Sequence, residues 1–253
     1  MRLSYGRRAA LGVVVATAAV CAVAFASATP AATRVHHGVR VTARPIHKLT
    51  NSTSSNWAGY AVTGSRYTSV SASWVQPAVN CSVTPTGWSS FWVGLDGDTT
   101  STVEQTGSEA DCSSGKAVYS AWYEMYPKFP TNYSNPVRAN DHFTASVTTD
   151  GRGNFVLTLS DTSQGWSRTA KAKLRSAKLG SAEVIAEAPS SSSGVLPLAD
   201  FGSVGFTGAT ANGKTFDTLS GRDAINMASG STTKASTSTI ASGGNFSVTW
   251  KDS

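Results

Sequence analysis

Apolar residues alternate with serine, threonine or other small residues in many short segments between about residues 55 and 250. A period of two places apolar side chains on one face of an extended strand. Such segments lie at 70–74, 117–125, 143–147, 154–160, 182–187 and 246–250, and Asn212-Gly213 is typical of a hairpin turn. Beyond residue 28 no stretch has a convincing helical period. The pattern predicts an all-β chain, an antiparallel sandwich or jelly roll of two packed sheets, and leaves 229–244 open between a long loop and weak strands.

The first 52 residues have a different character. Arg2, Arg7 and Arg8 precede an apolar run that ends in small residues at 26–28. This order predicts a secretory signal peptide over 1–28, hence a secreted protein with no membrane attachment after its removal. Residues 29–52 are rich in cations and contain no acidic residue, so they are predicted to be a basic pro-segment or linker. Residues 53–253 then form the single folded domain, expected to be a monomer.

Charge is divided between these parts. Residues 1–50 hold seven of the 21 Lys and Arg and none of the 15 Asp and Glu. The formal net charge of +6 therefore belongs to the leader, and the body is close to neutral. The body has no basic stripe with interleaved aromatic residues, so nucleic acid is not an expected partner.

The number of cysteines is consistent with export. Cys21 lies in the predicted signal, which leaves Cys81 and Cys112 in the body. An even pair in an exported domain is most simply a disulfide, and this one would close a loop around the segment 91–107.

The remaining residue types exclude several chemistries. His142 is the only histidine in the body, so a multi-histidine zinc site cannot be built, and no G-x-S-x-G, P-loop or Rossmann pattern occurs. We expect neither a metal nor a cofactor. His142 is predicted to be exposed or structural. Proton chemistry in this domain must then come from carboxylates.

Three places could supply such chemistry. The run 91–98 is dense in aromatic, glycine and acidic residues, and Gln105 in the next strand offers an amide that can polarise a substrate but cannot titrate. Alternation places Trp122 and Glu124 on one strand face, as on the floor of a cleft. Glu183 and Glu187 also share a face, but four residues of strand separate them by about 13 Å, too far for an acid/base pair.

These motifs occur together in a recognisable order. The blocks are 56–60 (NWAGY), 92–97 (WVGLDG), 104–107 (EQTG), 121–124 (AWYE) and 182–187 (AEVIAE). The set resembles the glutamic peptidases, or eqolisins, typified by acid endopeptidases of the scytalidopepsin B type. The resemblance implies a concanavalin A-like sandwich of two seven-stranded sheets, with a catalytic dyad of Gln105 and Glu187.

The resemblance also implies supporting or substrate-binding roles for Trp92, Asp96, Trp122 and Glu124, and polypeptides as substrates. A glutamate with an ordinary pKa of about 4.3 exchanges protons most readily in mild acid, so we expect an acid optimum. The family archetype has aspartates where Glu109 and Ser120 stand here, which changes the acidic character beside the site. A jelly-roll glycoside hydrolase using Glu124 and Glu187, and a carbohydrate-binding sandwich, are the alternatives.

Overall fold

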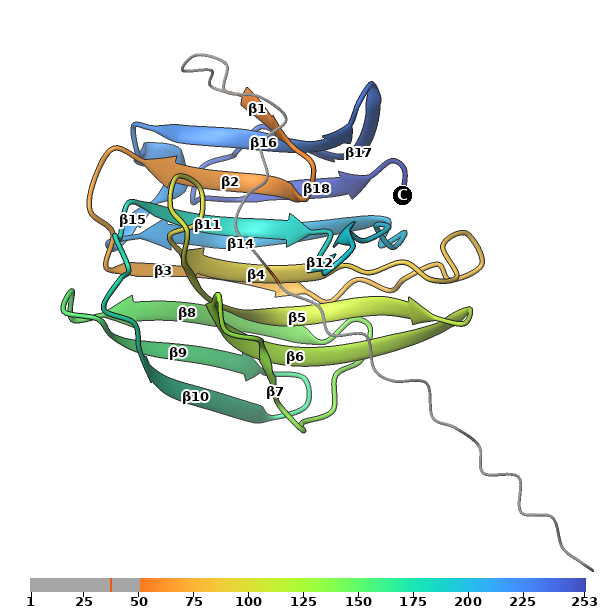
Figure 1. Cartoon of the computed structure of the whole chain (residues 1–253), viewed down its shortest axis with the longest axis horizontal. Helices are drawn as coiled ribbons and strands as arrows, with labels where there is room; N and C mark the ends of the chain where they lie inside the picture. Colours follow the sequence, from red (N-terminus) through yellow and green to blue (C-terminus); the bar gives the residue numbers. More distant parts are fainter. Residues whose placement is uncertain (1–36, 38–50) are drawn as a thin grey trace, which may run out of the picture. The chain divides into compact units, whose positions relative to one another are not determined.

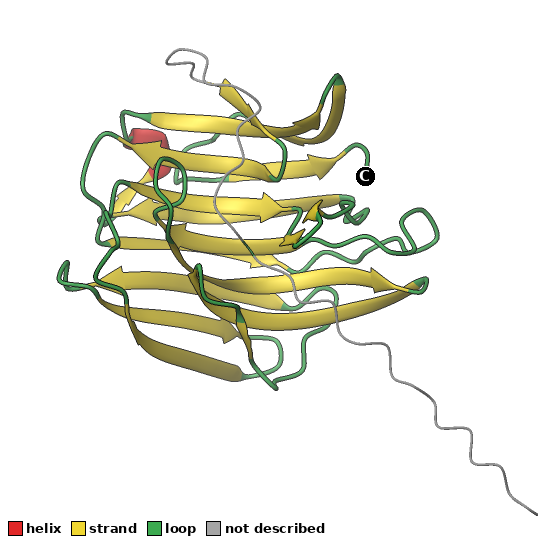
Figure 2. Ribbon diagram, in the orientation of Figure 1, coloured by secondary structure: helices red, strands yellow, loops and turns green. Residues whose placement is uncertain are grey.

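Strands make up the described chain, as the alternating pattern predicts. The structure is a computed structural model that describes His37 and residues 51–253, all within one compact unit. The predicted signal peptide, and the pro-segment apart from His37 and residues 51–52, lie outside the described residues. Within the described part, no helix is long and apolar enough to cross a membrane. Figure 2 shows the one helical element described, the 3-10 turn η1 (Phe216–Thr218).

The strands form two layers of antiparallel neighbours (Figure 1). One layer contains, in spatial order, β10 (Trp166–Lys173), β9 (Asn154–Asp161), β8 (His142–Thr149), β3 (Ser69–Val75), β14 (Ser203–Ala211), β18 (Phe246–Trp250) and β17 (Thr232–Thr237). The other contains β16 (Arg222–Ser229), β2 (Trp57–Thr63), β11 (Ser181–Glu187), β4 (Ser90–Leu95), β5 (Val103–Ser113), β6 (Lys116–Tyr126) and β7 (Thr131–Asn132). Because β17 pairs with both β16 and β18, the hydrogen-bonded path continues from one layer into the other. The sandwich class is confirmed.

Short strands complete the framework. β1 (Asn51–Ser54) runs parallel to β16, β12 (Ser190–Ser191) pairs with β13 (Gly194–Val195), and β15 (Lys214–Thr215) pairs with β14. Asn212 and Gly213 join β14 to β15 with φ of 50° and 74°, the positive values that a tight hairpin turn requires. The sequence left the stretch 229–244 open between a long loop and weak strands. The structure has both, since the strand β17 is followed by a loop.

The main core lies between the layers. Strands β4, β5 and β11 contact β3, β8, β9 and β14 across it. Its largest members come from alternate strand positions: Trp74 stacks on Phe143 with ring centroids 5.6 Å apart, and Phe206 packs against Phe246 at 5.1 Å. Burying each such side chain stabilises the fold by about 1.5 to 3 kcal/mol. This packing fixes the inner face of β4, β5 and β11, and therefore the direction of the residues on their outer face.

The predicted disulfide between Cys81 and Cys112 is present. It ties the loop before β4 to the end of β5. Both cysteines are buried. The bond therefore holds together the two strands that carry the central motif.

Removing this bond should cost stability. Replacing both cysteines with serine is expected to lower the free energy of unfolding by about 3 to 4 kcal/mol, because closing a loop of this length restricts the unfolded chain. The sequence separation is 31 residues. Urea unfolding of the parent and the double variant would measure the loss. A difference below about 1 kcal/mol would contradict the chain-entropy account.

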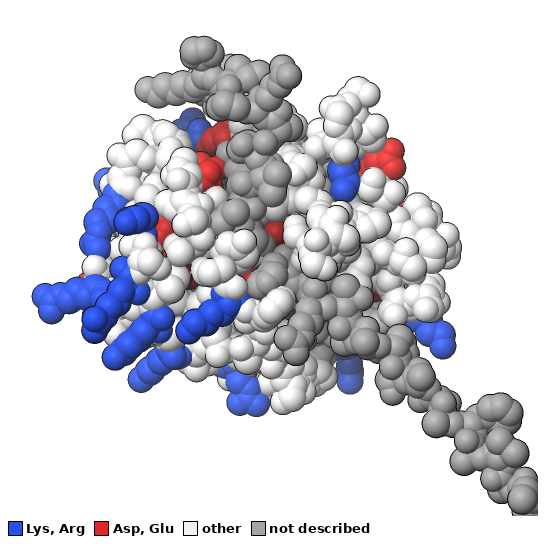
Figure 3. Space-filling view, viewed as in Figure 1, with Lys and Arg blue, Asp and Glu red and all other residues white. Residues whose placement is uncertain are grey.

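Acidic and basic side chains are distributed unequally. Nine of the 15 Asp and Glu are buried, whereas Lys234 is the one buried lysine or arginine in the described chain. The buried acids are Asp96, Glu104, Glu109, Asp111, Glu124, Asp141, Asp161, Glu183 and Glu187. Figure 3 shows Lys and Arg gathered over the side where β9 and β10 lie, where Arg168, Lys171 and Lys173 are exposed. The interior is therefore unusual in holding many carboxyl groups and almost no cations to pair with them.

Candidate active site

One face of five adjacent strands, β2, β11, β4, β5 and β6, brings the predicted site residues together. Gln105 lies opposite Gly94 on one side and Glu124 on the other. Glu187 lies opposite Trp57 and Ser90. Cross-strand partners and alternate residues point to the same side, so Glu187, Trp92, Gln105 and Glu124 share what we call the site face.

Tryptophans form the floor of the site face. Trp57, Trp92 and Trp122 are fully buried, and Trp57 meets Trp92 edge to face with centroids 5.0 Å apart. Two glycines make room for Trp92. A Cβ at Gly107 would lie 2.6 Å from the Trp92 Cβ, and one at Gly94 would lie 2.9 Å from Trp92 Cζ3. These contacts explain why glycines accompany Trp92 in the central motif.

Glu187 is fully buried at the end of β11 and is held on both oxygens. Its Oε2 accepts a hydrogen bond from Trp92 Nε1 at 2.8 Å, and its Oε1 accepts one from Asn56 Nδ2 at 3.4 Å. Asn56 is positioned in turn by Ser54, whose hydroxyl donates to Asn56 Oδ1 at 2.8 Å. Both donors are neutral, so they orient the carboxyl without adding charge.

Gln105 is also fully buried, and its amide has a defined orientation. Nε2 donates to Glu124 Oε2 at 3.2 Å and to the main-chain carbonyl of His37. Both partners accept, so the NH₂ group must face them. Oε1 is buried and has no hydrogen-bond partner among the described residues. Gln105 lies near the start of β5, a strand of 11 residues.

Burial controls the charge of Glu124. Its removal from water, with a smaller contribution from the charge of Glu109, raises the pKa of Glu124 to about 9, although hydrogen bonds from the His37 main chain and Gln105 act in the opposite direction. Glu124 is therefore protonated in acid and at neutral pH. A neutral carboxyl beside Gln105 does not repel negative charge that develops elsewhere on the site face.

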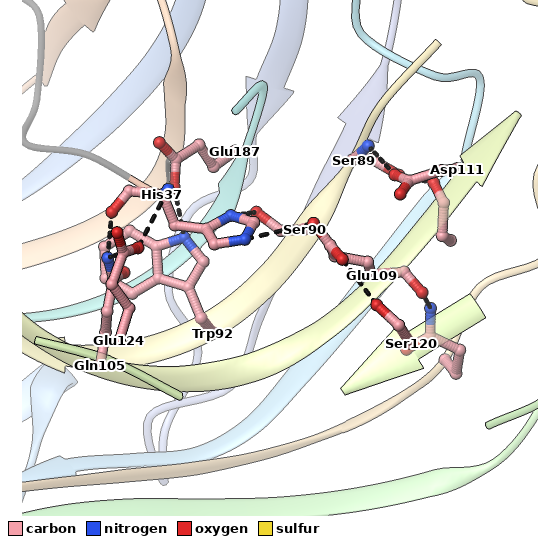
Figure 4. Close-up of polar contacts among 12 residues, drawn as sticks. His37, Ser89, Ser90, Trp92, Gln105, Glu109, Asp111, Ser120, Glu124 and Glu187 are labelled. Carbon is pink, nitrogen blue, oxygen red and sulfur yellow. Dashed lines mark hydrogen bonds and ion pairs between the residues drawn. The ribbon is translucent and has the colours of Figure 1, made fainter. Parts of the chain in front are cut away.

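His37 lies on the site face as well (Figure 4). Its ring stacks on Trp122 with centroids 3.7 Å apart and planes within 6°. Nδ1 lies 3.2 Å from Ser90 Oγ, and Nε2 lies 3.2 Å from Glu109 Oε1. Burial alone would raise the pKa of Glu109. The charge of His37 and the hydrogen bonds from His37 and Ser120 outweigh it and lower that pKa below its ordinary value.

The other predicted residues occupy different places. Trp122 forms the stacking surface for His37. Asp96 accepts three main-chain N–H bonds, from Lys178, Leu179 and Gly180 at 2.8, 2.8 and 2.7 Å, so it anchors the loop before β11. Glu183 shares the strand with Glu187 but is fully buried, and neither of its oxygens has a hydrogen-bond partner among the described residues. Glu124, Glu183 and Glu187 are thus all fully buried on the site face.

The sequence analysis did not identify His37 and Ser90 as part of this site. The sequence did show a cluster of histidines in a segment without acidic residues. No local pattern, however, predicts that His37 contacts a sheet. His142, in contrast, is exposed as predicted. Across the described residues, no group of three or more His, Cys, Asp or Glu side chains could hold a metal ion.

Comparison with known proteins assigns the family. Residues 55–250, more than half of the chain, match the family described as the Peptidase A4 family. The chain belongs to the peptidase A4 family. This A4 chain is 31% identical over 195 residues to aspergillopepsin-2 of Aspergillus niger, and the matched region covers 66% of this chain and 69% of that protein. It is 32% identical over 124 residues to scytalidopepsin B of Scytalidium lignicola, with 48% of this chain and 46% of that protein covered.

The fold comparison agrees with the family. The crystal structure of scytalido-glutamic peptidase with a transition state analog inhibitor matches with a TM-score of 0.67 and 26% identity, over 78% of this chain and 98% of that one. The resemblance to the glutamic peptidases is thus confirmed. The A4 chain is a glutamic-type endopeptidase, and the glycoside hydrolase and carbohydrate-binding alternatives are set aside.

Proposed function

We propose that this A4 peptidase is a secreted enzyme that cleaves polypeptides at acid pH with Glu187 as general base and Gln105 as oxyanion donor. The observation that carries the proposal is the amide of Gln105, whose Nε2 donates a hydrogen bond to a main-chain carbonyl. Glu187 on the same face is oriented by Trp92 and Asn56. Scytalido-glutamic peptidase, which has the same fold, binds a transition state analog.

The chemistry follows from these positions. Glu187 takes a proton from a water molecule, and the water oxygen bonds to the carbonyl carbon of the substrate. The carbonyl oxygen becomes negative, and Gln105 Nε2 stabilises it with a hydrogen bond that strengthens as the charge develops. Gln105 Oε1, buried without a partner among the described residues, is suited to accept a hydrogen bond from the other O–H of that water. The C–N bond then breaks, and Glu187 returns its proton to the leaving amine.

Glu124 acts as a positioning residue in this proposal. Its Oε2 accepts from Gln105 Nε2 and so fixes the amide plane. With a pKa raised to about 9 by burial, Glu124 adds no negative charge next to the forming oxyanion in acid. Trp92 and Trp122 exclude water around the reacting groups, which strengthens both hydrogen bonds.

Other parts of the proposal rest on the leader and the disulfide. The basic start and apolar run of residues 1–28 support export, and the Cys81–Cys112 bond is typical of exported domains. Polypeptides are the substrates that the family supports. Digestion of a denatured protein at about pH 4 and about pH 7 tests the acid preference, since a carboxyl base exchanges protons most readily in mild acid.

A Gln105→Ala variant tests the oxyanion donor. Its kcat is expected to fall about 100- to 1000-fold, the usual loss for one such donor, with a much smaller change in KM. Initial rates on a peptide substrate, with thermal unfolding to verify the fold, provide the measurement. A folded variant that retains most of the parent's kcat would remove Gln105 from the mechanism.

A further inference from the structure

A cavity of about 490 Å³ lies beside β2, β16 and the end of β17, three neighbouring strands that Figure 1 shows together. Its volume falls in the range of small-molecule sites. The residues that line it come from β2, from the segment 221–226 and from the segment 237–240. No aspartate or glutamate is found among the described residues of this lining. The cavity therefore differs from the site face, where carboxyl groups gather.

Alternation along β16 separates the cavity from the site face. Ile225 packs with Trp57 and Trp92, which belong to the site face. Arg222 and Asn226 lie an odd number of residues from Ile225, so they point to the other side of the strand, where they line the cavity. A ligand in the cavity therefore leaves the site face open to a substrate.

The free hydrogen-bonding groups of Arg222 and Asn226 are donors. Arg222 is exposed, and its Nη1 donates to the Leu219 carbonyl at 2.9 Å. The remaining N–H groups of this guanidinium have no hydrogen-bond partner within the described chain. Asn226 Oδ1 accepts from the Thr237 main-chain N–H at 2.8 Å, which fixes the amide and leaves Nδ2 to donate.

Two carbonyls of the lining are already used as acceptors. The Gly221 carbonyl accepts from the main-chain N–H of Thr63, and the Ser238 carbonyl accepts from the Tyr60 hydroxyl, both at 3.0 Å. A ligand that pairs with the free donors must therefore bring its own acceptor atoms. The planar fork of a guanidinium fits a carboxylate best, because two parallel N–H···O bonds can form.

The charge of Arg222 is not cancelled inside the cavity. Asp223 follows it in sequence but lies on the opposite side of β16, where it accepts from the Ser52 hydroxyl. Burial raises the pKa of the Tyr60 hydroxyl on the cavity wall, and the hydrogen bond to the Ile240 main chain and the charge of Arg222 oppose this rise. The positive charge therefore acts on the space that a ligand would fill.

We propose that this cavity is a second binding site, which takes the terminal carboxylate of a short peptide. Arg222 pairs with the carboxylate, and Asn226 Nδ2 donates to the same group. Ala224 and Ile240 add apolar wall for the body of the ligand. Hydrolysis of a peptide bond releases a new carboxylate at each cut, so such ligands form wherever this endopeptidase works. The inference does not depend on which residues form the catalytic dyad.

Calorimetric titration of the full chain with two peptides tests the proposal. N-acetyl-trialanine with a free C-terminus and the same peptide as its C-terminal amide differ only in the carboxylate. At about pH 5 this carboxyl group is ionised and Arg222 is charged. The free acid is expected to bind at least about tenfold more tightly than the amide, which cannot make the charge-assisted bonds. Mass analysis after the titration verifies that both peptides are intact.

Variants test the named residues. Arg222→Gln should weaken binding of the free acid at least about tenfold, and Arg222→Lys, which keeps the charge but not the fork, should bind with intermediate affinity. Asn226→Asp keeps an oxygen for the Thr237 N–H but places a negative charge in the cavity, so binding should be lost. Arg175→Gln removes an exposed arginine that does not line the cavity, and it should bind as the parent does. Thermal unfolding verifies that each variant is folded.

Three outcomes would overturn the proposal. The first is equal affinity of the parent for the free acid and the amide, a comparison that needs no variant. The second is an Arg222→Gln protein that binds the free acid as tightly as the Arg175→Gln protein does. Inorganic phosphate provides the third, because displacement of the peptide by an equal concentration of phosphate would show a site for small anions in general rather than for a peptide end.

Discussion

Replacing Glu187 with glutamine is expected to reduce hydrolysis of a denatured protein at acid pH to background, a loss of about 100- to 10,000-fold. Glutamine has the same size, and its oxygen can still accept the bond that Trp92 Nε1 donates to Glu187. It cannot take a proton from water. The fold should therefore survive while turnover is lost. Initial rates at equal protein concentration, with thermal unfolding of both proteins, measure the two effects.

Glu183→Gln is the matched control. Glu183 lies four residues earlier on the same strand, about 13 Å away by the rise of a strand. Its carboxyl oxygens have no hydrogen-bond partner among the described residues, and burial, with the charges of Asp98, Asp96 and Glu104, raises its pKa well above the ordinary value. Glutamine therefore imitates the protonated acid, and activity should stay close to the parent's. A Glu187→Gln protein that cleaves as fast as the Glu183→Gln protein would end the assignment of the base.

Most of the fold could be predicted because strand signals are local. The alternation at 143–147 marks β8, and Asn212-Gly213 marks a turn that only positive φ values allow. Two cysteines in an exported domain leave one pairing. The length of β5 could not be predicted, because its second half is polar and is a strand through pairing with β6 and through hydrogen bonds to β4 and the residues just before it.

The candidate site was predictable in its residue types but not in its environment. Motif order singled out Gln105 and Glu187 as the proposed dyad. Burial of Glu124 and Glu183 depends on strands far away in the sequence, such as the pairing of Glu183 with Ala61 and Gly94. The contact of His37 with Glu109 joins residues 72 positions apart and has no local signature. A period-two pattern shows which residues share a face, but not what covers that face.

The buried carboxyls also determine how stability depends on pH. Burial, and then the charge of Asp96, raises the pKa of Glu104 to about 8. Burial raises that of Glu183 well above its ordinary value. In the unfolded chain both groups lose their protons above about pH 4.3. Between that pH and the raised pKa values, the folded protein holds more protons than the unfolded chain, so stability decreases as the pH rises.

The enzyme is therefore expected to be most stable in acid and to lose about 1.4 kcal/mol of unfolding free energy per pH unit for each such group between about pH 5 and pH 8. Urea unfolding across this range measures the slope. Glu104→Gln with Glu183→Gln should make it shallower, because neither replacement titrates, while Glu124, whose pKa burial raises to about 9, keeps its own contribution. Asp150→Asn is the matched control: Asp150 is exposed, and hydrogen bonds led by the Asn154 side chain lower its pKa, so the slope should not change. A double variant that loses stability as steeply as the parent would show that other groups set the pH dependence.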